Sequence, residues 1–434
     1  MKIVLIGAGS RSFGRGQIAD VLQSRELRGL GVELHLVDVD AAALDVMGRV
    51  AERICRHTGS DVRINCGTDR LQALPGAEYV IVSVACQRYP LWEQDFRVPL
   101  AHGFRHCLGE NGGPGAVFHT MRSLRLVMPI CRDVERLCPD ALLLNFTNPE
   151  ARVIHAILTL TRVRAAGLCH GVFSALEAIE RYAGKPIEDL EVVSAGMNHF
   201  YCILHAVDRA TERDLLPELV GKAAEDASAP PLFRKMAEVF GVFTFPSDDH
   251  IGEYLSWGSD FHCVKWPYGQ ECRAVRPEEP PRGPSMEDYA CGAAPVDAAL
   301  LRPSGELAVP VIADIELNRG TRRPAVNVLN TSGFVSNLPR DAAVEVPAYV
   351  DAEGIQPQYV GPVPETFATM MHAQFTIQRL LTQAFAAAEA GRPGSRNLLL
   401  QALLLDPVVN SISEAEKLLD EMLALQKDYL PEFG

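Results

Sequence analysis

Two short segments carry residues that could bind a metal ion. Cys169 and His170 directly follow residues 165–168, a short apolar run that predicts a buried strand. Residues 196–199, Gly-Met-Asn-His, place Asn198 and a second imidazole, His199, after a turn-forming glycine. A thiolate and an imidazole together suit a soft or borderline divalent metal. The alternative is two unrelated buried residues, because free cysteine is among the residue types most often buried.

Two further segments offer acids and bases. Residues 109–115 contain four glycines, so they form a loop, and Glu110 is their only ionisable side chain. Glu110 is either an acid/base group or a solvated loop acid. Residues 247–254, Ser-Asp-Asp-His-Ile-Gly-Glu-Tyr, are dense in ionisable groups, including Asp248 and Tyr254. Such a cluster is typical of a catalytic site, or it begins a helix with Asp248 as the N-cap.

A dinucleotide site is indicated near the N-terminus. Residues 3–6 predict a buried strand, and Gly7, Gly9 and Ser10 after it form a turn through which a pyrophosphate can approach the backbone. The third glycine of the usual fingerprint is replaced by Ser12. A helix over residues 17–28 and a strand over 32–37 follow, and Asp38 ends that strand. An acid there accepts hydrogen bonds from a ribose diol and repels a 2′-phosphate, which favours NAD+. The alternative is an ordinary βαβ unit with a solvated Asp38.

The order of elements predicts an α/β fold with a Rossmann-like, doubly wound parallel sheet. Further strands are expected over residues 62–66, 78–84 and 142–145. Ligands bind at the carboxyl ends of strands in such sheets. Asn148 precedes a proline and is therefore held extended, either presenting its amide to a ligand or capping the next helix. The residues at or just beyond the strand ends are Gly7, Asp38, Ser83, Asn145, Asn148 and Cys169.

The second part of the chain is expected to be an α+β substrate domain. We place the boundary between residues 1–195 and 196–434. A strand is predicted over 201–207, a strand–turn–strand unit over 326–337, and polar or proline-rich breaks over 228–231 and 276–284. Residues 366–390 and 396–425 are long amphipathic helical stretches. Their apolar stripes would not be fully covered by a small domain, which predicts an oligomer.

The composition and net charge of the chain limit the kinds of partner that we expect it to bind. The net charge of −14 over 434 residues argues against a nucleic-acid or anionic-membrane partner. Eleven cysteines without CxxC pairs indicate a reducing compartment. The N-terminal apolar run stops at Gly7, too early for a signal peptide, and no apolar run is long enough to cross a membrane. We therefore expect a cytoplasmic protein that acts on small molecules.

Taken together, seven segments resemble glycoside hydrolase family 4, the NAD- and metal-dependent glycosidases. Residues 247–254, 344–357 and 429–431 resemble most closely the melibiase-type α-galactosidases of that family. The resemblance also suggests a homodimer or homotetramer. The seven segments are Gly7-Ala8-Gly9-Ser10, Asp38-Val39-Asp40, Gly113-Pro114-Gly115, residues 145–149, Cys169-His170, residues 196–199 and Asn337-Leu338-Pro339.

The chain departs from the family pattern at the site itself. Glu110-Asn111 stand where the family usually has Asp-Thr, and Ala116 replaces a glycine. Glu150-Ala151-Arg152 follow Pro149 in place of small or apolar residues. Such drift is compatible with a sister family, the NAD-dependent sulfoquinovosidases of glycoside hydrolase family 188.

The resemblance implies a redox-elimination mechanism rather than two opposed carboxylates. NAD+ takes a hydride from C3 of the sugar, and a metal ion, typically Mn2+, bound by Cys169 and His199 stabilises the enediolate. A base, Asp248 or Tyr254, removes the C2 proton, and an acid, Glu110, protonates the leaving oxygen. The residues expected to contact sugar hydroxyls or the surroundings of the metal are Asn148, His170 and Asn198.

Two other classes of function stay open. A lactate/malate-type dehydrogenase shares the NAD-binding fold and would accumulate NADH. An inactive NAD-binding regulator would keep Gly7 and Asp38 but has no need of Cys169 and His199. The presence of both pairs favours the enzyme.

Arginines near the predicted site bear on the substrate. Arg88, Arg97, Arg105 and Arg152 lie near strand ends or the Glu110 loop. Guanidinium groups suit carboxylate, sulfonate or phosphate, and Arg152 lies within one helical turn of Asn148. We therefore expect a hexoside that is anionic at C6, a sulfoquinovoside or a hexuronide. A neutral α-galactoside is the alternative, and a 6-phosphoglycoside comes third.

Overall fold

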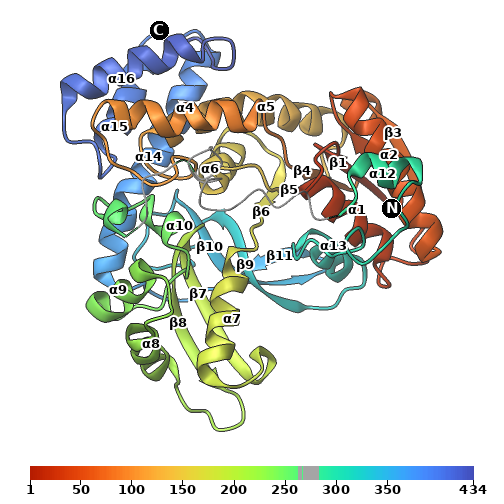
Figure 1. Ribbon diagram of the computed structural model, residues 1–434, viewed down its shortest axis with the longest axis horizontal. Coiled ribbons are helices and arrows are strands. Elements are labelled where there is room, and N and C mark those ends of the chain that lie inside the picture. The colour runs from red at the N-terminus through yellow and green to blue at the C-terminus, as the bar shows by residue number, and fades with distance from the viewer. Residues whose placement is uncertain (262–265, 267–282) are drawn as a thin grey trace.

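A single sheet of eleven strands runs through the chain in the computed structural model, which describes residues 1–261, 266 and 283–434 (Figure 1). The strands follow the order β3-β2-β1-β4-β5-β6-β9-β10-β7-β8, and β11 pairs with β10. Their bounds are β1 Lys2–Ile6, β2 Glu33–Val37, β3 Arg63–Gly67, β4 Tyr79–Val82, β5 Leu142–Asn145, β6 Arg164–Gly167, β7 Leu190–Met197, β8 Phe200–Asp208, β9 Thr321–Leu329, β10 Ala343–Asp351 and β11 Gly354–Pro357.

The first six strands form the predicted doubly wound sheet. They pair in parallel, and the chain reverses direction across the sheet between β1 and β4, where a ligand crevice opens in such folds. Strand β4 is buried throughout, as expected for a strand covered by helices on both faces. The predicted fold class and these six strands are confirmed, with shifts of one or two residues at several ends.

Helices cover both faces of the parallel strands, as Figure 1 shows. Helix α1 begins earlier than predicted because Gly14 lets it pass close to Ala8, where a Cβ would lie 2.5 Å from the carbonyl oxygen. The helices are α1 Phe13–Gln23, α2 Ala41–Thr58, α3 Arg70–Ala73, α4 Arg88–Ala101, α5 Gly115–Leu137, α6 Glu150–Leu160, α7 Gly171–Ala183, α8 Leu216–Glu225, α9 Pro231–Phe240, α10 Asp248–Gly252, α12 Met286–Cys291, α13 Ala308–Glu316, α14 Glu365–Glu389, α15 Ser395–Leu404 and α16 Ile412–Leu425.

The later strands continue the same sheet in antiparallel fashion. Strand β9 joins β6 through Gly167 and Asn327, and β10 joins β7 through Glu345 and Gly196. The predicted boundary between residues 195 and 196 falls inside β7, Leu190–Met197. The two parts of the chain therefore share one hydrogen-bonded sheet.

The strand–turn–strand unit predicted over residues 326–337 is wrong in its second half. Strand β9 ends at Leu329, and Val335 makes only an isolated bridge, to Gly361. The buried Asn330 side chain explains the difference. Its Nδ2 donates to the carbonyl oxygens of Val335 and Leu338 at 3.0 Å each, and its Oδ1 accepts from the Val335 N–H. These bonds close a loop where a second strand would have to pair.

The C-terminal helical stretches are part of the core. Helix α14 is confirmed, but residues 396–425 form two helices, because Pro407 cannot continue α15. These helices pack on one another and on α4, α5 and α6. Most of their apolar side chains are covered within the chain, although Ile412 and Leu425 of α16 stay exposed, and the oligomer stays a prediction. The buried residues that they contribute include Ile377, Leu381, Phe385, Leu399, Leu403, Leu418 and Met422.

The two predicted breaks and the question of a membrane-spanning helix have the following outcomes. The break predicted at 228–231 separates α8 from α9, whereas the one at 276–284 lies largely outside the described residues. Within residues 1–261, 266 and 283–434, no helix combines the length and the apolar character needed to cross a membrane.

Truncating Phe385 tests whether the C-terminal helices are core. Phe385 is 1% exposed, so Phe385→Ala should lower the free energy of unfolding by about 3–5 kcal/mol. The matched control is Ile412→Ala in α16, since Ile412 is 60% exposed and should change stability little. Denaturant unfolding measures both. Equal effects of the two substitutions would contradict the assignment of these helices to the core.

Candidate functional site

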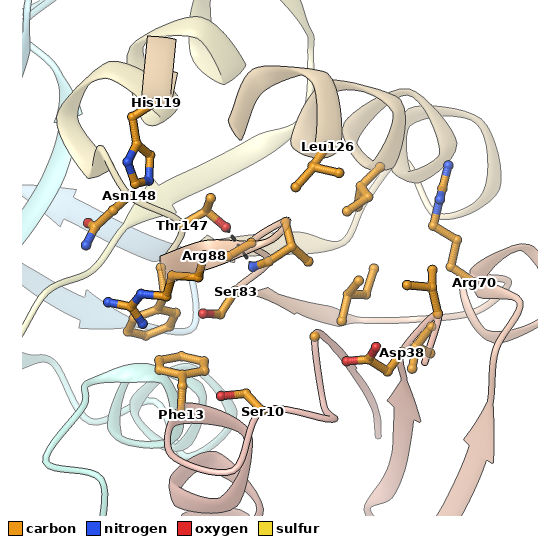
Figure 2. A pocket seen from close by; sticks show the side chains of 18 of the residues that line it. Ser10, Phe13, Asp38, Arg70, Ser83, Arg88, His119, Leu126, Thr147 and Asn148 are labelled. Carbon is orange, nitrogen blue, oxygen red and sulfur yellow. Dashed lines mark hydrogen bonds between the residues drawn. The ribbon is translucent and has the colours of Figure 1, made fainter. Parts of the chain in front are cut away.

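A cavity of about 420 Å³ opens at the carboxyl ends of the parallel strands (Figure 2). It extends along the sheet edge from Asp38 after β2 to the residues that follow β4 and β5. The predicted site residues that line it are Gly7, Ser10, Asp38, Ser83, Glu110 and Asn148. Gly9 lines a smaller neighbouring hollow.

The turn after β1 brings its backbone close to neighbouring segments, which requires glycine. Gly7 has a φ of 94°, and a Cβ there would lie 1.9 Å from the carbonyl oxygen of Ser83. The Gly9 N–H donates to Asp38 Oδ2 at 2.8 Å, and the Asp40 N–H donates to Oδ1 at 3.0 Å. Asp38 thus fixes the turn as well as lining the cavity, and each carboxylate oxygen retains a lone pair for a further donor.

Asn145 stabilises the backbone that forms one wall of the cavity. It is fully buried, its Nδ2 donates to the carbonyl oxygen of Thr147, and its Oδ1 accepts from the Thr147 N–H, both at 3.2 Å. Thr147 Oγ1 in turn accepts from the Val84 N–H at 3.1 Å. Asn145 therefore ties the chain after β5 to the chain after β4, and Asn148 stands on this support with its carbonyl bonded to Ser123 Oγ at 2.6 Å.

Cys169 and His199 meet as predicted. Their Sγ and Nε2 atoms are 3.3 Å apart, with Cys169 just beyond β6 and His199 between β7 and β8. His199 has a φ of 63°, the left-handed conformation that the tight turn requires. Burial lowers the pKa of His199 well below its ordinary value and raises that of the Cys169 thiol. The imidazole is therefore neutral, which is the form that binds metals.

A buried acidic side chain, that of Glu345, links the segment that carries Cys169 to the segment that carries His199. Glu345 Oε2 accepts from Asn198 Nδ2 at 2.9 Å and from Asn327 Nδ2 at 3.2 Å. Asn198 precedes His199, while Asn327 also reaches the carbonyl oxygen of Gly167, two residues before Cys169, at 3.4 Å. Glu345 on β10 thus fixes the two segments that carry the thiol and the imidazole.

The pair fits a divalent ion that leaves positions open for substrate. Thiolate and imidazole are ligands of Zn2+ and similar borderline divalent ions, and a catalytic metal site keeps a coordination position open for water or substrate. In the described part of the chain, no group of three or more His, Cys, Asp or Glu side chains is arranged to hold a metal. His170 is largely exposed, and its Nδ1 lies 2.8 Å from Glu306 Oε1, which raises its pKa.

The Glu110 loop rests on a second buried acidic side chain, that of Glu253. Glu253 Oε1 accepts from the N–H groups of Glu110 and Asn111 at 2.7 and 3.0 Å. Burial, and then the nearby Glu110 charge, raise the pKa of Glu253 to about 8. Gly112 passes over Glu253 so closely that a Cβ would lie 2.4 Å from its carbonyl oxygen. Sequence reasoning noticed the charged cluster that contains Glu253 but gave this residue no role.

The two candidate bases have different surroundings. Both carboxylate oxygens of Asp248 accept backbone N–H groups at the start of α9, from Leu232 at 2.9 Å and Phe233 at 3.0 Å. Asp248 thus caps a helix, although α9 rather than the helix it begins. The Tyr254 hydroxyl donates to the carbonyl oxygen of Asn198 at 3.3 Å, beside the turn that carries His199. Burial raises the pKa of the Tyr254 hydroxyl well above its ordinary value.

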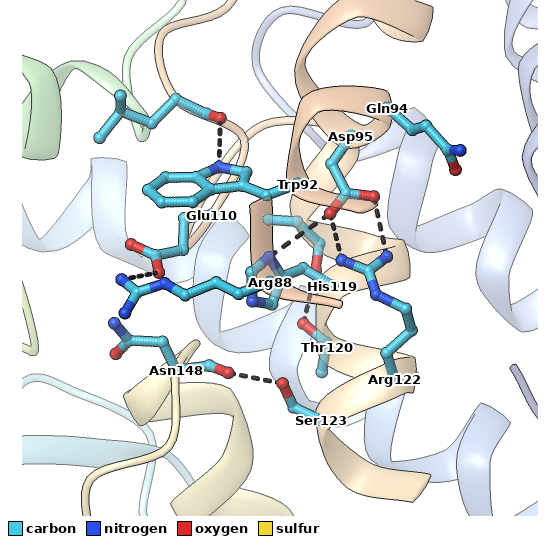
Figure 3. A network of polar contacts seen from close by, with 12 residues as sticks. Arg88, Trp92, Gln94, Asp95, Glu110, His119, Thr120, Arg122, Ser123 and Asn148 are labelled. Atoms are coloured by element: carbon cyan, nitrogen blue, oxygen red, sulfur yellow. Dashed lines mark hydrogen bonds and ion pairs between the residues drawn. The ribbon is translucent and has the colours of Figure 1, made fainter. Parts of the chain in front are cut away.

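The four arginines considered as substrate ligands differ in burial and in their partners. Arg152 is buried, and its Nη2 donates to Gln374 Oε1 at 3.3 Å, so it is not among the described residues that line the cavity. Arg97 pairs with Glu93 on α4, and Arg105 is exposed. Arg88 lines the cavity, with its guanidinium 3.7 Å from Glu110 (Figure 3).

Two family models cover most of the chain. Residues 2–184 match the family 4 glycosyl hydrolases, and residues 194–409 match the C-terminal domain of the same family. The chain belongs to family 4 of the glycosyl hydrolases. The resemblance predicted from the sequence is confirmed, and the lactate/malate-type dehydrogenase is set aside.

Relatives of this family 4 enzyme differ in substrate. An α-glucosidase of Erwinia rhapontici is 30% identical, covering 99% of this chain and 98% of its own. An α-galactosidase of Rhizobium meliloti is also 30% identical, covering 100% and 90%. An α-galacturonidase of Bacillus subtilis is 27% identical, covering 98% and 97%. A gut-microbial 6-phospho-α-glucosidase, crystallised with NAD and Mn2+, superposes with a TM-score of 0.82 at 20% identity, covering 100% and 99%.

The raised pKa of Glu253 predicts a pH-dependent stability. The folded protein holds Glu253 protonated up to about pH 8, whereas the ordinary carboxyl pKa is 4.5. The stabilisation is therefore complete below pH 4.5 and is lost as the pH rises through 8. Glu253→Gln keeps the acceptor oxygen and removes the titration. The Tm of the parent minus that of Glu253→Gln should fall from pH 5 to pH 8; a constant difference would contradict the assignment.

Proposed function

We propose that this family 4 enzyme uses NAD+ and a divalent metal ion, Mn2+, to hydrolyse a hexoside that is anionic at C6, a sulfoquinovoside or a hexuronide. The shape of the cavity supports NAD+. Gly7, Ser10 and Asp38 offer a backbone turn for the pyrophosphate and an acceptor for the adenosine ribose, in the order that dinucleotide sites require. The nicotinamide is then proposed to lie toward the opposite end of the cavity, near Asn148.

The metal is proposed to bind Cys169 and His199. Their Sγ and Nε2 atoms lie 3.3 Å apart, and Glu345 holds Asn198, the residue before His199. The imidazole is neutral. A bound cation supplies charge stabilisation to oxygen atoms of the oxidised sugar. Asn198 and His170, next to the two ligands, are proposed to contact sugar hydroxyls, together with Asn148 on the cavity wall.

The chain supplies the proton transfers. Tyr254 is proposed to take the C2 proton as its phenolate, since its oxygen lies beside the turn that carries His199. Glu110 is proposed to protonate the leaving oxygen, because its side chain lines the cavity while Glu253 fixes its backbone. Asp248 is bound at both oxygens and remains the second candidate for the base.

Arg88 carries the proposal of an anionic substrate. Its side chain is about half exposed on the cavity wall, and it lies over the rings of Trp92 and Tyr89 at 5.6 and 5.7 Å. Among the described residues, no acceptor lies within hydrogen-bond distance of its guanidinium, so its donors are available to a ligand. The relationship to α-galacturonidases supports this proposal, whereas the α-galactosidase relative supports the neutral alternative.

Isotope incorporation tests the chemistry. Turnover in D2O should give a product sugar with deuterium at C2, because the proton removed from C2 is replaced from solvent. NADH should not accumulate, since the hydride returns to the sugar. Product without deuterium at C2 would indicate direct hydrolysis and contradict the proposed elimination.

A substrate panel tests the role of Arg88. We expect p-nitrophenyl α-galacturonide or α-sulfoquinovoside to be cleaved faster than the neutral α-galactoside or the 6-phosphogalactoside, with NAD+ and Mn2+ present. Arg88→Ala should lower kcat/KM for the anionic substrate by about 10- to 100-fold, because a charged hydrogen bond contributes about 1.5–3 kcal/mol. The neutral substrate should change much less.

Arg105→Ala is the matched control, because Arg105 is exposed and is not among the described residues that line the cavity. Titration with NAD+ identifies a different role. A loss of NAD+ affinity in Arg88→Ala, with an unchanged ratio between the substrates, would place the guanidinium on the dinucleotide. Turnover of the neutral α-galactoside alone would refute the anionic substrate.

A further inference from the structure

A histidine backed by a buried aspartate also faces the cavity (Figure 3). His119, on the first turns of α5, lines the cavity, and its Nδ1 lies 3.4 Å from Asp95 Oδ2 on α4. The Trp92 ring packs edge-on against the imidazole, with centroids 6.3 Å apart. No sequence pattern indicates this pair, because His119 and Asp95 are far apart in the chain and belong to no motif.

Asp95 is held as a carboxylate. It is fully buried, and Arg122 donates to both of its oxygens, to Oδ1 at 2.9 Å, while Gln426 Nε2 donates to Oδ1 at 3.1 Å. Burial alone would raise the pKa of Asp95, but the charge of Arg122 and the contact with His119 hold it below its ordinary value. A carboxylate can only accept hydrogen bonds. The Asp95 carboxylate, 3.4 Å from Nδ1, therefore favours the ring tautomer that carries its proton on Nδ1 and leaves Nε2 as an acceptor.

The position of His119 in the cavity gives this acceptor a place in the reaction. Figure 2 shows its ring beside Asn148, at the end of the cavity away from Asp38. With the adenosine ribose at Asp38, that end receives the nicotinamide, and the sugar carbon that is oxidised must lie against it. The charged groups that face His119 are Asp95 and Arg88 on α4, Arg122 on α5 and Glu110 in the loop.

We propose that His119 Nε2 takes the proton of the hydroxyl on the sugar carbon that is oxidised. This rests on the proposed function, in which Tyr254 and Glu110 act at other atoms and leave this proton without an acceptor. The C–H electron pair leaves as hydride to NAD+, the O–H proton passes to His119, and a C=O bond forms. When the ketone is reduced, His119 returns the proton and the balance is restored. Asp95 is the positioning residue that selects the tautomer.

His119→Gln is the first test. Glutamine keeps a hydrogen-bond acceptor but cannot take a proton at neutral pH. On mixing the preferred glycoside of the panel with enzyme, NAD+ and Mn2+, the absorbance rise from NADH in a single turnover should slow by about 100-fold or more. The kinetic isotope effect from deuterium at C3 should rise, while the affinities for NAD+ and substrate stay close to those of the parent.

His155→Gln is the matched control. His155 is another buried histidine, but its Nδ1 lies 2.7 Å from Thr382 Oγ1, and it is not among the described residues that line the cavity. It should leave the C3 isotope effect unchanged. If His119→Gln loses NAD+ or substrate affinity but forms NADH at the parent rate, His119 is a binding residue and the inference is wrong. An unchanged C3 isotope effect overturns it as well.

The tautomer provides a readout that needs no turnover. In the protein without added metal or cofactor, labelled with 15N-histidine, the resonances that disappear in His119→Gln should show a protonated Nδ1 and an unprotonated Nε2. Protonation at Nε2 would overturn the inference. Failure of the proposed function is separate: parent enzyme that cleaves a glycoside without transient NADH and without a C3 isotope effect does not use redox chemistry at all.

Discussion

The arrangement of the site depends on one buried carboxylate, that of Glu345. Its Oε2 binds both Asn198 and Asn327, and so joins the turn that bears His199 to the strand that contacts Gly167. Burial raises the pKa of Glu345, and the two amide donors oppose that rise. Removing the carboxylate would leave two buried amide groups without their acceptor, which costs more than the bonds themselves contribute. The separation of Cys169 and His199 is therefore set in part by Glu345 and Asn327, which are far from both of them in the chain.

Other carboxylates of the site act in the same way, on backbone rather than on substrate. Glu253 holds the loop that presents Glu110, Asp248 binds two N–H groups at the start of α9, and Asp38 binds the glycine turn. Each satisfies donors that would otherwise be buried without partners. The side chains that face the cavity, such as Arg88 and Asn148, thus extend from backbone segments that such hydrogen bonds hold in place.

The sequence was sufficient for the parallel sheet and for much of the site, because both depend on local patterns. Short apolar runs ended by glycine, acid or amide residues located six strands and placed Gly7, Asp38, Asn148 and Cys169 at their ends. What could not be predicted depends on contacts between distant segments. Arg152 lies in a helix next to Asn148, yet its side chain turns into the interior toward Gln374. The second strand predicted after β9 gave way to a loop closed by Asn330, and the pairing of Asp95 with His119 has no local signature.

The continuous sheet has a consequence for the order in which the site is made during synthesis. The segments that carry Cys169 and His199 leave the ribosome well before β9 and β10, which pair with β6 and β7 and bring Asn327 and Glu345. A nascent chain that has just completed its Rossmann-like half has both donor side chains but nothing to hold them at a fixed separation. It follows that the glycine turn after β1 can form early, whereas the fixed separation of Cys169 and His199 that the proposed metal site needs has to wait until the chain has been translated past β10.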